Sequence, residues 1–149
     1  MAGVDIQINT REVLEINEQL KAMSGFDARP LMRSLAAELQ SQTQNRIVEE
    51  KASPEGEAWK PWAEEYALTR HQGNSLLRGE GRLFESIQAH FDSNEAESGT
   101  NVIYGAIHQF GGEPVGMPIP ARPYMGISDE NYTDLSQIIT NYVVRLIND

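Results

Sequence analysis

The sequence predicts an α+β protein, in which short antiparallel strands accompany two long helices. Apolar residues alternate with polar ones at 4–8 and again at 87–92, which indicates strands because successive side chains of a strand point to opposite faces. Apolar residues recur at helical spacing over 28–50 and 132–147. The 149 residues favour a single domain spanning 1–149, since a chain of this length can bury a core of its own.

The first third of the chain predicts one strand and two helices. The strand at 4–8 is followed by a helical pattern at 11–23. Asp27 is a suitable N-cap for the long helix at 28–50. Residues 40–45 of that helix are weakly apolar, so we expect this section to be exposed or to meet another subunit.

The next segment, 51–82, is the least regular part of the sequence. Pro61 is suited to the first turn of a short helix. Trp59, Trp62 and Tyr66 follow the spacing i, i+3, i+7, so we expect them to pack on one helical face.

A hairpin comes next. Residues 82–86 suit a single helical turn, and the strands at 87–91 and 96–103 are joined by a turn at Ser93-Asn94.

The stretch 104–128 is unusually rich in residues that set backbone geometry, with four of the seven prolines and five of the twelve glycines. Residues 104–110 indicate a short helix that ends at Gly111-Gly112. Residues 117–123 are extended, because each residue before a proline is kept out of the helical region. Since proline cannot donate to a strand ladder, this segment is an edge strand or an arm.

Side chains of this stretch have predicted orientations. Ile107 and Phe110 face inward, whereas Tyr104 and His108 stack one turn apart. We expect the His108 side chain to donate a hydrogen bond that fixes the glycine turn or the arm. Arg122 is expected to pair with a carboxylate and to hold the arm in place.

The last helix has the clearest pattern in the sequence. Ser128 is its N-cap, and Asp129 and Glu130 lie favourably near its positive end. Its apolar stripe comprises Tyr132, Leu135, Ile138, Ile139, Tyr142, Val143, Leu146 and Ile147.

Composition excludes several classes of function. The absence of cysteine excludes a disulfide framework, a thiolate zinc site and a cysteine nucleophile. The net charge of −10 argues against binding nucleic acid or anionic membranes through a general basic surface. Residues 1–10 lack the basic start and apolar run of a signal peptide, and no apolar window approaches the roughly 20 residues of a membrane span.

No catalytic constellation is evident, and we predict a protein without enzymatic activity, cofactor or metal. The sequence has no histidine pair with metal-ligand spacing, no nucleophile elbow and no phosphate loop. Two alternatives stay open. One is a small hydrolase that uses His108 and Glu113, with Arg122 as an anion clamp. The other is a protein-binding module that exploits the acidic surface.

Four short segments stand out in order along the chain: Gly81-Arg-Leu-Phe-Glu-Ser-Ile87, Gly99-Thr-Asn-Val-Ile-Tyr104, Ile107-His-Gln-Phe-Gly111 and Ile119-Pro-Ala-Arg-Pro-Tyr-Met-Gly-Ile-Ser128. In this order they resemble the phage virion morphogenesis, or tail completion, family of Mu-like and related contractile-tailed phages. The upstream Trp59-Lys-Pro-Trp62 is similar as well, so the resemblance covers about 53–130.

This resemblance implies helices packed on a small antiparallel sheet, and a structural protein that completes tails or joins heads to tails. It implies a homo-oligomeric ring in the virion, with DNA only as cargo in the channel. The partners would be further copies of the chain and tail tube, terminator or head-connector proteins, assembled in the host cytoplasm without a membrane.

The proline-stiffened arm would then be a docking surface, because a stiff segment loses little entropy on binding. The residues that we expect on this surface are Tyr104, His108, Phe110, Pro118, Ile119, Pro120, Arg122, Pro123 and Tyr124.

Overall fold

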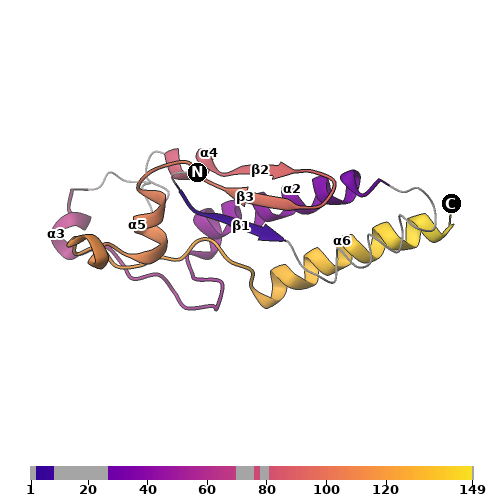
Figure 1. The fold of residues 1–149 in the computed structure, drawn as a ribbon. Coiled ribbons are helices and arrows are strands. Elements are labelled where there is room, and N and C mark those ends of the chain that lie inside the picture. The colour runs from indigo at the N-terminus through magenta and orange to yellow at the C-terminus, as the bar shows by residue number, and fades with distance from the viewer. Residues whose placement is uncertain (1–2, 9–26, 70–75, 78–80, 149) are drawn as a thin grey trace.

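A computed structural model describes residues 3–8, 27–69, 76–77 and 81–148 (Figure 1). The predicted helix at 11–23 and the loop at 71–75 lie outside these residues. In chain order the elements are β1 (Asp5–Ile8), α2 (Arg29–Asn45), the π-helical turn η1 (Arg46–Glu50), α3 (Glu64–Ala67), α4 (Arg82–Ser86), β2 (Gln88–Phe91), β3 (Ala96–Gly99), α5 (Gly105–Phe110), the 3₁₀ turn η2 (Glu113–Val115) and α6 (Asp129–Asn148).

The sheet has the strand order β1-β3-β2, and both pairings are antiparallel. Its register places Ser98 of β3 between Ile6 of β1 and Ala89 of β2. The predicted hairpin turn is confirmed, and the side chain of Asp92 accepts hydrogen bonds from the two backbone N–H groups that close it. The second strand of the hairpin is shorter than predicted, because the chain leaves the sheet after Gly99 and turns toward α5.

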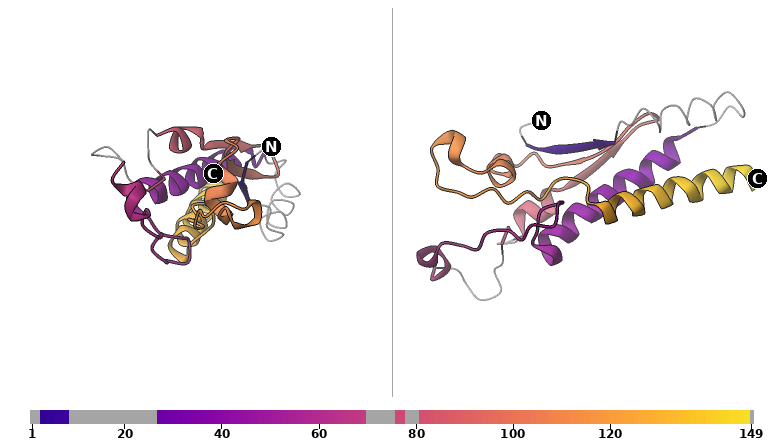
Figure 2. Two further views of the ribbon diagram at one scale, coloured as in Figure 1. Left: turned by 90° about the vertical axis from the view of Figure 1, so that its left-hand side faces the viewer. Right: turned by 90° about the horizontal axis from the view of Figure 1, so that it is seen from below.

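Helix α2 packs against β2 and β3, and α6 packs against α2 (Figures 1 and 2). Leu31, Leu35 and Leu39 recur every four residues along α2 and are buried, since this spacing places them on one face. They form a core cluster with Ala96 of β3 and Leu135 of α6. The predicted α+β class is therefore confirmed, with a small antiparallel sheet packed by a long helix near the start and an amphipathic helix at the end.

The apolar stripe of α6 is confirmed in its middle and overestimated at its ends. Leu135 is buried, whereas Tyr132 and Ile147 are exposed. The partly buried residues that pack on the same core are Ile138, Ile139 and Tyr142. The hydroxyl of Tyr142 donates to the carbonyl of Asp27, just before α2 begins, so the last turns of α6 continue past the start of α2.

The prediction that Trp59, Trp62 and Tyr66 pack on one helical face is wrong. Helix α3 begins three residues after Pro61. Trp59 lies in the extended chain before this helix, where its backbone N–H donates to the carbonyl of Lys51 (2.9 Å). Trp59 is buried in a second cluster with residues of α4 and of the segment before α6. Trp62 and Tyr66 make a ring contact, with centroids 6.1 Å apart.

Polar residues near the end of α2 are buried, so the prediction that 40–45 are exposed or meet another subunit is wrong for Gln42 and Thr43. Thr43 donates its hydroxyl to the carbonyl of Leu39 (3.0 Å), and Gln42 donates to the carbonyl of Asn131 (3.2 Å). These internal hydrogen bonds offset the cost of burying the hydroxyl of Thr43 and the amide nitrogen of Gln42.

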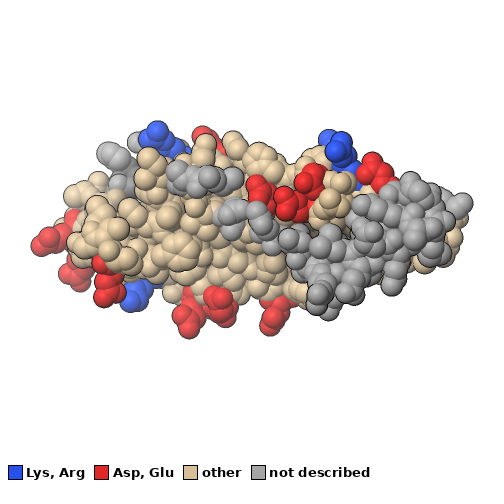
Figure 3. All heavy atoms as spheres, in the orientation of Figure 1, with Lys and Arg blue, Asp and Glu red and all other residues tan. Residues whose placement is uncertain are grey.

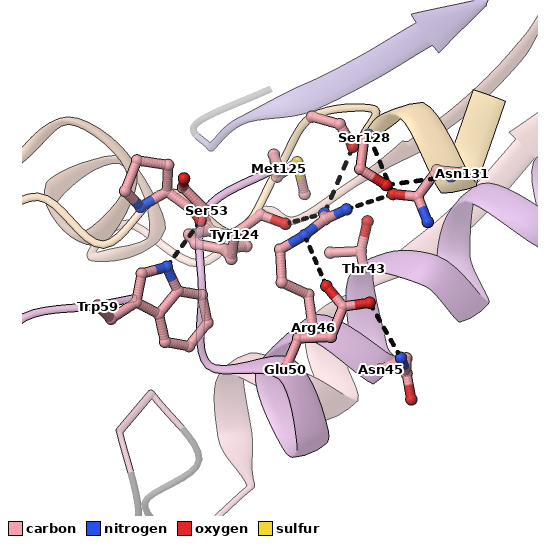
Figure 4. A network of polar contacts seen from close by, with 12 residues as sticks. Thr43, Asn45, Arg46, Glu50, Ser53, Trp59, Tyr124, Met125, Ser128 and Asn131 are labelled. Carbon is pink, nitrogen blue, oxygen red and sulfur yellow. Dashed lines mark hydrogen bonds and ion pairs between the residues drawn. The ribbon is translucent and has the colours of Figure 1, made fainter. Parts of the chain in front are cut away.

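Arg46 lies at the centre of this polar region and is fully buried (Figure 4). Its guanidinium donates to the carbonyl of Tyr124 (2.7 Å) and to the side-chain oxygen of Asn131, and lies 3.6 Å from the carboxylate of Glu50. Burial lowers the pKa of Arg46, and the nearby carboxylate of Glu50 opposes that shift. Oxygen atoms from three segments of the chain therefore stabilise the buried positive charge of Arg46.

The predicted N-cap of α6 is confirmed. The hydroxyl of Ser128 accepts a hydrogen bond from the N–H of Asn131 (3.0 Å), and the side chain of Asn131 accepts one from the N–H of Ser128 (3.2 Å). Because the same oxygen of Asn131 binds Arg46, the end of α2 and the start of α6 are fixed together.

Candidate docking surface

The stretch between β3 and α6 folds into α5, the turn η2 and an extended arm, Met117–Pro123. The loop between α5 and the arm is closed by its own backbone, since Gly112 donates to the carbonyl of Ile119 (2.8 Å) and accepts from the N–H of Met117 (2.9 Å). A Cβ atom at Gly112 would lie 2.7 Å from the Cβ of Met117. Only glycine fits at this position, and the path of the loop is therefore set by the sequence.

Arg122 anchors the middle of the arm. Its guanidinium donates to the carbonyls of Lys60 (2.8 Å) and Pro61 (3.1 Å), and its backbone N–H donates to the carbonyl of His108 (2.7 Å). The prediction of a carboxylate partner is wrong, because backbone carbonyls satisfy the charge instead. Only 6% of Arg122 is exposed, so its side chain binds the arm to its own chain and is not available to a partner.

Gln109 and Trp59 hold the end of the arm. The side-chain oxygen of Gln109 accepts from the N–H groups of Tyr124 (3.1 Å) and Met125 (2.9 Å), and its amide donates to the carbonyl of Met125 (3.0 Å). The indole of Trp59 donates to the carbonyl of Pro123 (2.9 Å). Sequence reasoning missed Gln109. A signal for it was available in the sequence. Gln109 is an amide side chain on a short helix, and the extended segment that follows has backbone groups without a strand partner, to which such an amide can bond.

Tyr124 lies in the core and not on a docking surface, which corrects the prediction for this residue. Its side chain is 0% exposed, and its hydroxyl donates to the carbonyl of Gly105 (2.8 Å). Burial, and then the neighbouring Tyr104, raise the pKa of Tyr124. A Cβ atom at Gly105 would lie 2.8 Å from the hydroxyl of Tyr124 and 2.9 Å from the methyl group of Thr100, so this helix start needs glycine.

His108 packs edge-on against Tyr104 with ring centroids 5.8 Å apart, as the spacing predicts. The predicted hydrogen bond from its side chain is wrong: Nδ1 is buried and has no hydrogen-bond partner among the described residues. The backbone carbonyl of His108 fixes the arm instead. Burial lowers the pKa of His108, and the charge of Arg122 lowers it further.

The structure does not assemble the residues of the hydrolase alternative. Glu113 is exposed on η2, and the guanidinium of Arg122 is already bound to two carbonyls. His108 therefore has neither an orienting carboxylate bonded to its Nδ1 nor a free anion clamp beside it.

We expect the protein to lose stability as the pH falls through the range in which His108 takes up a proton. Because the pKa of His108 is lower in the folded protein, unfolded chains bind this proton more readily. The stabilising contribution is present above the unfolded pKa of about 6.5 and is lost as the pH falls toward the folded value. Urea unfolding at about pH 7.5 and pH 5.5 measures the slope of the free energy of unfolding against pH.

The control for this pH dependence is His90→Gln, because His90 is exposed on β2. His108→Gln should flatten the slope, while His90→Gln should keep it. An unchanged slope in His108→Gln would contradict the assignment to His108.

Four apolar residues around the closed loop remain exposed, and we call them the end patch. Phe110 is 66% exposed, Val115 65% and Met117 46%, and Pro118 is exposed beside them. The prediction that Phe110 faces inward is wrong, because α5 ends at this residue and the chain reverses at Gly111, leaving the ring outside. Sequence reasoning missed Val115 and Met117, although both flank the predicted proline arm.

The other predicted docking residues are partly buried and therefore offer less surface to a partner than the end patch does. These residues are Tyr104, His108, Ile119, Pro120 and Pro123. In the described part of the chain, no group of three histidine, aspartate or glutamate side chains is placed to hold a metal ion. Nor does any described helix have the length and apolar character that crossing a membrane requires.

The sequence profile of the phage virion morphogenesis family matches residues 7–144, and the chain belongs to this family. It is 34% identical over 148 residues to the Mu-like prophage FluMu G protein 2 of Haemophilus influenzae, which covers 97% of this chain and 99% of the relative. It is 33% identical over 149 residues to the putative capsid assembly protein G of Escherichia phage Mu, which covers 94% of each. Comparison with solved structures returned no match.

Proposed function

We propose that this protein acts late in virion assembly, where it completes the tail or joins the tail to the head as a homo-oligomeric ring without enzymatic activity. Membership of the phage virion morphogenesis family supports a role in assembly. In this proposal the partners are further copies and tail tube, terminator or head-connector proteins. DNA is only cargo in the channel, and assembly takes place in the host cytoplasm.

The observation that supports a docking role is the end patch, whose apolar side chains are exposed on a loop fixed by hydrogen bonds. Phe110 and Met117 are presented by a loop whose backbone is hydrogen-bonded to itself, and the arm behind it is bound by Arg122 and Gln109. A patch that is ordered before it binds loses little conformational entropy on docking, so more of the burial energy appears as affinity. Several exposed apolar side chains grouped along one loop are typical of an interaction site.

A second candidate function is assembly of the head itself. It is favoured by the name of the phage Mu relative, putative capsid assembly protein G. The two roles make different predictions for the particles that form when the protein is missing.

Deleting the gene from an inducible phage genome should leave separate heads and tails in the lysate, as seen by electron microscopy. Complementation with the wild-type protein should restore joined virions, and Phe110→Ser combined with Met117→Ser should not. The matched control is Phe91→Ser, which removes an exposed phenylalanine from β2. Normal joined virions without the protein would refute the assembly role, and absence of heads would favour capsid assembly over the tail role.

A further inference from the structure

Strand β2 lies at a free edge of the sheet. In the order β1-β3-β2 it pairs with β3 on one side, and no strand of the described part of the chain pairs with its other side. Figure 1 shows β2 along the upper margin of the molecule. Gln88, His90 and Phe91 of this strand are exposed. One side of the β2 backbone is therefore open to a further strand.

The register with β3 shows which backbone groups face that open side. In an antiparallel pair, every second residue exchanges hydrogen bonds with its neighbour, and the residues between direct their N–H and C=O groups away from it. The backbone N–H of Asp92 donates to the carbonyl of Glu95 (3.0 Å), and His90, two residues earlier, belongs to the same bonded set. Ala89 and Phe91 belong to the other set and present their N–H and C=O groups to the free edge.

The two ends of this free edge are defined by other contacts. Before Ala89, the carbonyl of Ile87 accepts a hydrogen bond from the side chain of Gln40 on α2 (2.8 Å), so the backbone is already satisfied there. After Phe91, the chain reverses in the hairpin turn, and the carboxylate of Asp92 is bound to the backbone of that turn. The open edge is therefore the segment 88–91.

Strand β2 lacks the charged side chain, the proline and the bulge that often keep an edge strand from pairing. Its residues are Gln-Ala-His-Phe, and its register with β3 runs without an extra residue. Along the upper margin in Figure 3, uncharged residues lie between the charged side chains near α4 and those farther along the molecule. In a chain with a net charge of −10, two copies can therefore meet at this edge without opposing carboxylates.

The free edge of β2 is complementary to a second copy of itself. When two copies run antiparallel across a two-fold axis at His90, Ala89 of each copy lies opposite Phe91 of the other. These are the two residues with outward groups, so each facing pair exchanges two hydrogen bonds. Ala89 and Phe91 also share a face, so a small side chain lies opposite a large one. The ring of Phe91, which is 42% exposed in one copy, is then covered by the strand of the other.

We propose that two copies of this protein associate through β2, so that their sheets form one continuous antiparallel sheet across a two-fold axis. Backbone hydrogen bonds set the register, and burial of Phe91 adds affinity. A two-fold contact closes on itself, so it produces a dimer and not a ring. The dimer is additional to the proposed function, because β2 is separate from the end patch beyond α5 (Figure 1).

A disulfide at the two-fold axis tests the contact directly, because the chain has no cysteine. In the proposed register His90 faces His90 of the other copy as a non-hydrogen-bonded pair, with Cα atoms about 4.5 Å apart. This separation suits a disulfide. His90→Cys protein treated with oxidised glutathione should therefore form a covalent dimer, as seen by non-reducing electrophoresis. The control is Gln88→Cys, an exposed position on the same strand and face that lies away from the axis.

Two outcomes of the disulfide experiment would overturn the proposal. Absence of a covalent dimer of His90→Cys at the highest soluble concentration would show that the strands do not meet. Equal yields of covalent dimer from His90→Cys and Gln88→Cys would show random collision instead of a defined register.

Proline substitution tests the outward N–H groups. Ala89→Pro removes an N–H that faces the free edge, and the hairpin keeps its bonds to β3. We expect the dissociation constant of the dimer to rise at least about tenfold in sedimentation experiments, because each dimer loses two hydrogen bonds. Ala89→Ser keeps the N–H and should dimerise as the wild type does. A folded Ala89→Pro protein with wild-type dimerisation would overturn the proposal, and if this variant does not fold, the disulfide result decides.

The dimer and the proposed function can fail separately. Phe91→Ser should weaken the dimer and still support joined virions, because the end patch is intact. Phe110→Ser combined with Met117→Ser should keep the dimer and lose joined virions. A covalent His90→Cys dimer together with normal virions after gene deletion would refute the assembly role alone. Unjoined heads and tails without this covalent dimer would refute the β2 contact alone.

Discussion

Replacing Arg46 by methionine should lower the free energy of unfolding by about 3 kcal/mol. The guanidinium donates to the buried carbonyl of Tyr124 and the side-chain oxygen of Asn131, and it lies beside the carboxylate of Glu50. Methionine retains much of the apolar stem but leaves these oxygen atoms without their cation. Because a buried polar group that loses its partner pays the full desolvation penalty, the loss exceeds that of an exposed ion pair. Urea unfolding followed by far-ultraviolet circular dichroism measures the change.

The matched control is Arg33→Met on the exposed side of the same helix, which should change stability by less than about 0.5 kcal/mol. Asn131→Ala removes the other partner of the contact. The double variant should be less destabilised than the sum of the two single variants, since both remove one shared interaction. An Arg46→Met protein that unfolds at the wild-type urea concentration would show that the buried cation is not needed.

The elements that were predictable from the sequence are those specified by local periodicity. The spacing of Leu31, Leu35 and Leu39 predicts a helix and its buried face, and both are present. The hairpin is equally local, since its two strands are joined by a short turn. The pairing of β1 with β3 joins residues more than 80 positions apart, and the alternation of 4–8 contains no information about its partner.

Buried polar residues were not predictable for a different reason. Arg46 and Gln42 belong to residue types that are mostly exposed, so a prediction from type places them in solvent. Their burial depends on backbone carbonyl groups 78 and 89 positions later in the chain. Only the folded arrangement of α2 against the start of α6 makes these partners available.

The sequence indicated which segment forms the candidate docking surface, but not which of its side chains point outward. The composition of 104–128 correctly indicates an irregular segment, because proline fixes its own φ angle and glycine adopts backbone angles that other residues resist. Which side chains point outward depends on where α5 ends, and a six-residue helix leaves too few turns to define a face. Phe110 is consequently exposed, which agrees with its predicted place on the docking surface but not with its predicted inward orientation, whereas Tyr124 is buried, contrary to the prediction.

Replacing Tyr124 by alanine should destabilise the protein by about 3–5 kcal/mol. The ring is fully buried and packs in one cluster with Ile47, Leu83 and Ile87, so its removal leaves a cavity beside η1 and α4. Tyr124→Phe should cost only about 1 kcal/mol, because it removes the hydrogen bond to Gly105 and keeps the ring. Thermal and urea unfolding of the two variants separate the contribution of packing from that of the hydroxyl.

The same pair of variants distinguishes a structural role of Tyr124 from a docking role. Tyr124→Phe leaves the end patch in place, and it should self-associate and support virion assembly as the wild type does. Tyr124→Ala should fail in both through loss of the folded arm, and lowering the temperature should restore function together with folded protein. Failure of a fully folded Tyr124→Phe protein to assemble would mean that the hydroxyl contacts a partner. The burial of that group against the backbone of α5 argues against this outcome.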